Sequence, residues 1–192
     1  FSFVVKRKFA DDGAEALATV KIDRESDVPP LDQIYGQVKK YVYSVRKSDK
    51  NDSTTDKMNL LLIMPRPILR FAMRVLRWLE YHGRYPKALM YDDPYYSSVF
   101  LSNLGSIKMS ADYHHLANWG TNSIFVIIGE MKPTPFYAAD GSVSVREALK
   151  LSLTIDERIA DGFYFANSIK ILKKLFECPE LIERPLNEPI EL

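Results

Sequence analysis

The sequence has little of what marks several common classes of protein. Only one of its 192 residues is a cysteine, so the chain forms no internal disulfide and has no cysteine cluster for zinc. Its longest largely apolar stretch, residues 58–78, is interrupted by two prolines and four arginines, which excludes a membrane-spanning helix there. Basic and acidic residues nearly balance, 26 against 25, so the positive excess typical of nucleic-acid-binding proteins is absent.

Several enzyme motifs are missing as well. The chain has no glycine-rich phosphate-binding loop, no Gly-x-Ser-x-Gly nucleophile and no Cys/His metal pattern, so we expect no metal site. Cys178 is predicted to be a small buried apolar side chain in a reducing cytosol, which favours a cytoplasmic protein. We expect no signal peptide before the first strand. The chain opens on Phe1 rather than Met, and we expect an N-terminal part of the fold to be missing.

The sequence does contain enough apolar material for a core, 46% of its residues, in patterns typical of strands and of helices. Residues 1–9 and 16–22 predict a hairpin that turns at residues 11–13. Further strands are predicted at 99–101, at 124–128 as a buried central strand, and at 148–155 after a turn at 140–141. Helical spacing predicts helices over 31–45, 68–82 and 161–176, with loops at 48–56 and 91–96. Strands and helices without strict alternation indicate a single α+β domain over residues 1–192.

The segment richest in chemistry follows the last predicted strand. It reads Asp156-Glu157-Arg158-Ile159-Ala160-Asp161-Gly162 and leads into the last helix. Ionisable groups at the end of a strand lie at the rim of a sheet, where a cleft can form. Asp161 is also a favoured residue for capping a helix N-terminus.

Two other segments precede this one in the sequence, and their order and spacing matter for the argument. Residues 100–105 read Phe-Leu-Ser-Asn-Leu-Gly, and residues 124–129 read Ile-Phe-Val-Ile-Ile-Gly. In this order and spacing, the three segments resemble the chloramphenicol-acetyltransferase-like superfamily, and within it the acyltransferase catalytic domain of 2-oxoacid dehydrogenase complexes. The resemblance runs from about residue 99 to 179. It implies an α+β two-layer sandwich with a mixed β-sheet, of which this chain is the C-terminal portion.

The resemblance also assigns roles to residues. Ser102 matches the family serine that stabilises the oxyanion of the tetrahedral intermediate, and Asp161 matches the aspartate that orders the loop. Glu157 stands where the family has its catalytic histidine. Asn103, Gly105 and His115 are expected to line the substrate cleft. The matching positions of Asp156 and Arg158 hold the loop and a subunit contact in the family.

The replacement of histidine by Glu157 matters chemically. A thiol with a pKa near 8.5 is mostly protonated at neutral pH and needs a base before it can attack. A histidine, with a pKa near 6.5, suits that task, whereas a solvated glutamate, near 4.3, is a weaker base. The resemblance therefore implies a coenzyme-A-dependent acyltransferase, active as a homotrimer with the cleft between subunits, in which Glu157 is an altered base. The alternative is a catalytically inactive trimer that serves as a binding or scaffold module.

Two further patterns remain open. Residues 114–120 (His-His-Leu-Ala-Asn-Trp-Gly) imitate the catalytic motif but lie before the central strand, and adjacent histidines on a strand would point to opposite faces. Arginines recur at helical spacing in the second helix, which indicates a solvated basic face, a subunit interface, a site for coenzyme A phosphates or a contact with anionic lipid. The broad spread of apolar residues round this helix favours burial between subunits or against the sheet. The arginines are Arg66, Arg70, Arg74 and Arg77.

Overall fold

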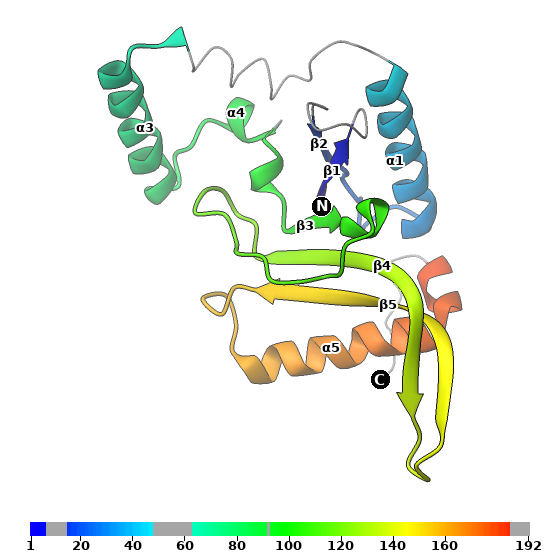
Figure 1. The fold of residues 1–192 in the computed structure, drawn as a ribbon. Coiled ribbons are helices and arrows are strands. Elements are labelled where there is room, and N and C mark those ends of the chain that lie inside the picture. Colours follow the sequence, from blue (N-terminus) through cyan, green and yellow to red (C-terminus); the bar gives the residue numbers. More distant parts are fainter. Residues whose placement is uncertain (7–14, 48–62, 92, 185–192) are drawn as a thin grey trace.

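A mixed five-stranded sheet in the order β2-β1-β3-β4-β5 forms the centre of the molecule (Figure 1). The structure is a computed structural model that describes residues 1–6, 15–47, 63–91 and 93–184. The strands β1 and β3 pair in parallel, as do β3 and β4, whereas the two outer pairs are antiparallel. The strands are β1 (Ser2–Lys6), β2 (Glu15–Thr19), β3 (Val99–Asn103), β4 (Ile124–Tyr137) and β5 (Val143–Ile155).

The helices lie around this sheet and confirm the predicted α+β class. The three predicted helices are present as α1 (Pro30–Lys47), α3 (Arg66–Tyr81) and α5 (Gly162–Glu177). The region 91–96, predicted to be a loop, contains the end of the short helix α4 (Lys87–Tyr91) and the 3-10 turn η1 (Pro94–Tyr96). This prediction was wrong because local signals, Pro86 before α4 and the Asp93 cap of η1, form single turns too short to show a periodic pattern. Two further 3-10 turns are η2 (Leu104–Ile107) and η3 (Pro179–Glu183).

The N-terminal hairpin packs against α1. Val5 and Ala16, from β1 and β2, are buried against Val45 of α1. The hydroxyl of Tyr41 donates to the carbonyl oxygen of Leu17 at 2.7 Å, which ties the helix to the edge strand. The predicted turn at residues 11–13 and the predicted loop at 48–56 lie outside the described residues.

The β4–β5 hairpin is much longer than the sequence predicts. It extends past residue 128 to Tyr137 and turns at Asp140, whose carboxylate accepts from the Ser142 amide at 2.9 Å. Pro133 and Pro135 conceal this extension, because proline is normally incompatible with a central strand. Here they are tolerated, since the register of β3 with β4 ends at residue 128, and beyond it β5 is the one partner strand of β4 among the described residues. The distal half of the hairpin projects away from the rest of the sheet (Figure 1).

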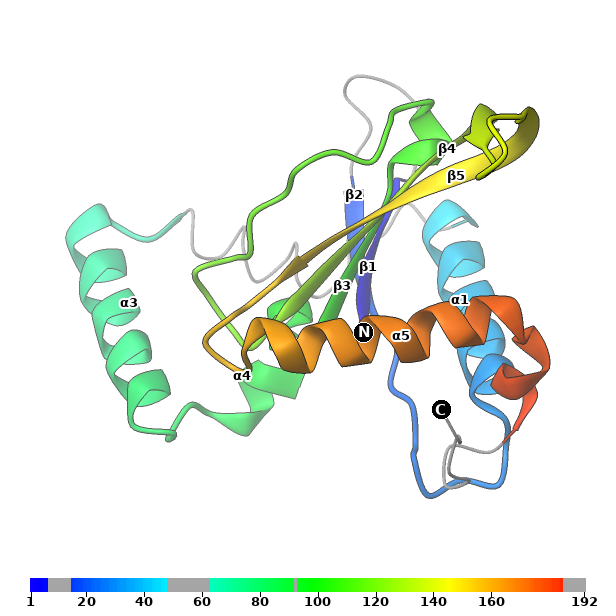
Figure 2. The same ribbon diagram turned by 90° about the horizontal axis from the view of Figure 1, so that it is seen from below.

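The two faces of the sheet are covered differently. Figure 2 shows α5 and α1 on one side of the strands and the segment 108–122 on the other. Phe125 packs on His114 of this segment and therefore lies on its side of the sheet. Phe100 is paired with Phe125, so it shares that face, and the two rings stack at 5.1 Å. The hydroxyls of Ser152 and Thr154 donate to the carbonyl oxygens of Ala111 and His114, at 2.9 and 2.7 Å, and hold the segment on β5.

Gly129 allows this segment to approach the sheet. It lies where the β4–β5 register shifts, and a Cβ placed on it would come within 2.7 Å of the Ala111 nitrogen. A Cβ on Gly105 would similarly meet the Gly129 carbonyl oxygen at 2.6 Å. Both glycines therefore permit backbone-to-backbone contact that no side chain could share.

Substitution of Gly129 by alanine should consequently destabilise the fold. We expect Gly129→Ala to lower the free energy of unfolding by about 1–3 kcal/mol, the usual cost of forcing an extra methyl group into a packed site. Gly36→Ala is the matched control, because nothing lies within 4 Å of its Cβ position in α1. It should be neutral or raise stability by up to about 1 kcal/mol, since alanine favours helix. Urea unfolding measures both, and equal stability of the two variants would contradict the packing assigned to Gly129.

Candidate functional site

The turn between β5 and α5 is fixed by a short-range ion pair. The Asp156 amide donates to the Ser123 carbonyl oxygen at 2.9 Å, which holds the turn against the start of β4. The Arg158 guanidinium donates to both carboxylate oxygens of Asp156, from Nη2 at 2.6 Å and from Nε at 2.8 Å. The Asp156 side chain is only 12% exposed, whereas that of Arg158 is 84% exposed. Hydrogen bonds from Arg158 lower the pKa of Asp156, so the pair is charged at neutral pH and holds the turn.

Asp161 closes the same turn as the N-cap of α5. Its carboxylate accepts from the Tyr164 amide at 2.9 Å, which satisfies one of the free donors of the first helical turn. The sequence-based role of Asp161, ordering the loop, stays a prediction, and the capping contact is one physical means of performing it.

Glu157 lies between these fixed points and is exposed. It makes no hydrogen bond or ion pair with any other residue in the described part of the chain. Ser102 is half-buried near the end of β3, and within residues 1–6, 15–47, 63–91 and 93–184 its hydroxyl also has no hydrogen-bond partner. Both side chains thus remain available to a ligand.

Ser102 and Glu157 nevertheless lie toward opposite ends of the sheet. Ser102 pairs with Ile127, which in turn pairs with Ser152. Because β5 runs against β3, the chain continues from Ser152 in the direction away from the end of β3. Ile155 lies about 10 Å farther along, at about 3.3 Å per residue, and Glu157 follows beyond it. Within one copy of the chain the two predicted catalytic residues do not meet.

The predicted cleft residues fall into different surroundings. Asn103 caps η2 by accepting from the Ser106 amide at 3.3 Å, and Gly105 packs its backbone on Gly129. His115 is exposed in the segment 108–122. The structure therefore places Asn103 and Gly105 beside Ser102. His115 belongs to the segment 108–122, which crosses the side of the sheet opposite α1 and α5.

His114 is a candidate that the sequence analysis passed over. The segment is not a strand, so the expectation that neighbouring histidines lie on opposite faces of one does not apply. The ring of His114 packs on Phe125, with centroids 4.9 Å apart, and its Nδ1 atom is buried without a hydrogen-bond partner among the described residues. In the sequence, the only sign of this position was the pair of adjacent histidines, His114 and His115. Cys178, predicted to be buried, is half-buried at the C-terminal end of α5.

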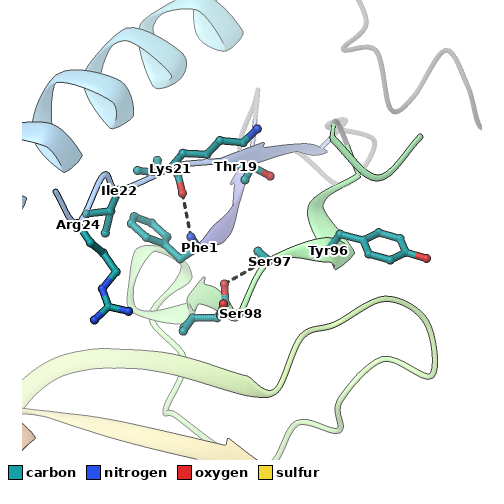
Figure 3. A pocket seen from close by; sticks show the side chains of 10 residues that line it. Phe1, Thr19, Lys21, Ile22, Arg24, Tyr96, Ser97 and Ser98 are labelled. Atoms are coloured by element: carbon teal, nitrogen blue, oxygen red, sulfur yellow. Dashed lines mark hydrogen bonds between the residues drawn. The ribbon is translucent and has the colours of Figure 1, made fainter. Parts of the chain in front are cut away.

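A separate pocket opens where β1 begins (Figure 3). It has a volume of about 510 Å³ and lies between the end of β2, the residues that follow it, and the segment leading into β3. Lys21 and Arg24 supply its cationic side chains, and Ser97 and Ser98 supply hydroxyls. None of the residues predicted to form the acyl-transfer site lines this pocket.

Comparison with known proteins gives one family. The profile of the family described as 2-oxoacid dehydrogenases acyltransferase (catalytic domain) matches residues 86–183, just over half of the chain. No curated protein sequence matched the chain. Among the described residues no helix is long and apolar enough to cross a membrane.

Three solved structures are similar to the chain to different degrees. A probable dihydrolipoamide acetyltransferase of Listeria monocytogenes 4b F2365 is 16% identical, with a TM-score of 0.50, over 99% of this chain and 58% of its own. The dihydrolipoamide acetyltransferase of Azotobacter vinelandii is 21% identical over 59% of this chain and 45% of its own, with a TM-score of 0.39. The cubic core of a pyruvate dehydrogenase multienzyme complex is 18% identical over 62% and 46%, also with a TM-score of 0.39. The chain thus spans about half the length of these proteins, between 45% and 58%.

The capping role of Asp161 can be separated from a need for its charge. We expect Asp161→Ala to lower the free energy of unfolding by about 1 kcal/mol and Asp161→Asn to leave it nearly unchanged, because asparagine caps equally well. Asp112→Ala, at an exposed site in the segment 108–122, is the control and should change stability by less than about 0.5 kcal/mol. Urea unfolding measures all three. If Asp161→Asn lost as much stability as Asp161→Ala, the hydrogen bond to the Tyr164 amide would not be what Asp161 contributes.

Proposed function

The chain belongs to the 2-oxoacid dehydrogenase acyltransferase family, and from that premise we propose that it is part of a coenzyme-A-dependent acyltransferase whose site forms between two copies of the chain. The observation that carries the proposal is the separation of Ser102 from Glu157. Neither side chain has a hydrogen-bond partner among the described residues, yet the antiparallel course of β5 keeps the two apart in one copy. A second copy that brings its own turn 156–161 to the end of β3 would unite them.

The distal part of the β4–β5 hairpin supports such an assembly. Large apolar side chains are exposed on it, and an exposed apolar patch on a projecting element is typical of a protein contact. We propose that these side chains are covered in a homotrimer. They are Met131, Phe136, Tyr137, Val143, Val145 and Leu149.

In this assembly Ser102 and Glu157 take complementary roles. The acceptor's nucleophilic atom attacks the thioester carbonyl of acyl-coenzyme A, and Glu157 takes the proton from that atom. Ser102 donates a hydrogen bond to the oxyanion that forms on the carbonyl oxygen. The carbon–sulfur bond then breaks, and the proton passes from Glu157 to the departing thiolate of coenzyme A. The products are the acylated acceptor and free coenzyme A.

The remaining residues of the turn would position Glu157 rather than react. The Asp156–Arg158 pair holds one side of the turn, and the Asp161 cap holds the other. A base fixed by its neighbours keeps its geometry during the reaction, which is where much of the benefit of a positioned base arises. An amine or hydroxyl acceptor is as compatible with this chemistry as a thiol.

One observation favours the second candidate, an inactive trimer that serves as a binding or scaffold module. A carboxylate stands where the family has an imidazole, and in a single copy it is exposed. A solvated carboxylate is a weaker base toward a thiol than an imidazole is. The two candidates share the assembly and differ in whether acyl transfer occurs.

Release of free coenzyme A from acyl-coenzyme A, followed with a thiol reagent, separates the two candidates. We expect turnover with an added acceptor to fall by about 10²-fold or more in Glu157→Gln, the usual loss for a general base. It should fall by a similar factor in Ser102→Ala, as for an oxyanion donor. Glu25→Gln is the matched control, because it removes the same charge from an exposed position in the loop before α1, outside both the turn and the hairpin, and should leave turnover unchanged.

Two results would contradict the enzymatic proposal. One is no turnover with thiol, amine or hydroxyl acceptors together with no coenzyme A binding by calorimetry, which would favour the scaffold. The other is full turnover in Glu157→Gln, which would remove Glu157 from the reaction. The measurements use the full-length protein.

A further inference from the structure

Glu80, the single carboxylate of helix α3, holds the end of the helix against the rest of the molecule. Glu80 accepts a hydrogen bond from the Tyr96 hydroxyl at 2.8 Å and another from the Gly120 amide at 3.2 Å. Tyr96 in turn stacks on Tyr85 at 5.0 Å, and Trp119 meets both rings edge-on. Burial and the hydrogen bond to Glu80 raise the pKa of Tyr96, so its hydroxyl stays a donor. The C-terminal turn of α3 is thus fixed to the body.

The rest of α3 stands clear of the sheet. In both Figure 1 and Figure 2 the helix lies to one side of the strands rather than over either face. Of the two expected surroundings, burial against the sheet is therefore not found, and burial between subunits stays a prediction. None of its residues is buried. Phe71 is 67% exposed, Ile68 53% and Trp78 52%, so large apolar and aromatic side chains face solvent.

The polar side of α3 is uniformly cationic. At about 100° per residue, its four arginines fall within a sector of about 80° and are all exposed. Glu80, the single carboxylate of α3, is directed at Tyr96 and Gly120, and among the described residues it forms no ion pair with these arginines. Arg84 and Lys87 follow directly and are also exposed. The arginines are Arg66, Arg70, Arg74 and Arg77.

The exposed apolar side chains adjoin this cationic sector. On the same helical projection Trp78, Phe71 and Val75 follow the arginines at about 40–100° from the edge of their sector. A helix with arginines on one side and tryptophan, phenylalanine and aliphatic residues on the next is the type that lies in the headgroup region of a bilayer. The arginines extend over about 16 Å of helix, so they form a line rather than a pocket for one small anion.

We propose that α3 binds the surface of an anionic phospholipid membrane, with Phe71, Val75 and Trp78 at the boundary of the acyl chains and the arginines on lipid phosphates. Charge complementarity selects this partner. Pairing of the same face with a second copy about a twofold axis would bring the arginines of two helices together, which electrostatic repulsion opposes. The inference goes beyond acyl transfer and does not depend on it.

Vesicle co-sedimentation of the full-length protein tests the proposal. We expect binding to vesicles of phosphatidylcholine mixed with phosphatidylglycerol, little binding to phosphatidylcholine alone, and release at high salt. Arg70→Gln with Arg74→Gln should weaken partitioning by about 30-fold, from about 1 kcal/mol for each charge. Lys40→Gln with Arg46→Gln is the control, since it removes the same charge from exposed positions on α1 and should have no such effect.

Tryptophan fluorescence tests the orientation of the helix. Emission should shift to shorter wavelength on anionic vesicles in the unmodified protein, and Trp78→Phe should abolish that shift. Trp119, which donates to Asp93 at 3.2 Å within the body, should report no change.

Three results would overturn the proposal. The first is absence of binding to either vesicle. The second is binding that the arginine substitutions leave intact. The third is a fall in mass by light scattering in Phe71→Ser with Trp78→Ser, without any vesicle binding by the unmodified protein, which would assign this face to a second copy of the chain.

Discussion

The opposite directions of β3 and β5 across β4 are the constraint on which the account of the site depends. Ser102 lies near the end of β3, and the turn with Glu157 follows the end of β5. Two residues at the ends of antiparallel strands cannot approach each other unless a loop returns over the sheet. Here the chain enters α5 instead, and Asp161 fixes that entry. A site that uses both residues therefore requires a second copy. Two further features agree with such an assembly: both side chains lack a partner among the described residues, and the projecting hairpin exposes apolar side chains.

Rigid surroundings distinguish this site from a loose collection of polar residues. The Asp156–Arg158 pair and the Asp161 cap hold the turn. At the other end, Gly105 and Gly129 let η2 and the segment 108–122 lie directly on the sheet, beside Ser102. The turn is therefore held in place on both sides of Glu157, the residue that the resemblance places at the position of the family's histidine. A rigid turn is required by both proposed functions, an acyltransferase that uses Glu157 as its base and an inactive trimer that serves as a binding module.

Much of the fold could be predicted from the sequence, because the strongest signals are local. The periodicity of α1, α3 and α5 and the alternation in β5 each depend on neighbouring residues. The order of the sequence motifs also predicted that Ser102 and Glu157 both lie at the ends of strands. The full length of β4 could not be predicted, because whether Pro133 and Pro135 are tolerated depends on where the partner strand β3 ends. The position of α3 depends on the contacts of Glu80 with Tyr96 and Gly120, which are distant in sequence. His114 was missed because its burial comes from an irregular segment crossing the sheet.

The most direct test of the central claim joins the two halves of the site chemically. In a Cys178→Ser background, Ser102→Cys and Glu157→Cys are combined in one chain, and the assembled protein is treated with a short bifunctional maleimide. Because the two positions lie toward opposite ends of the sheet in one copy, a short linker reaches both only across a subunit boundary. The account predicts covalent dimers and trimers on a denaturing gel, absent when either cysteine is omitted. Cross-linking confined to single chains, or none in a protein that light scattering shows to be assembled, would contradict it.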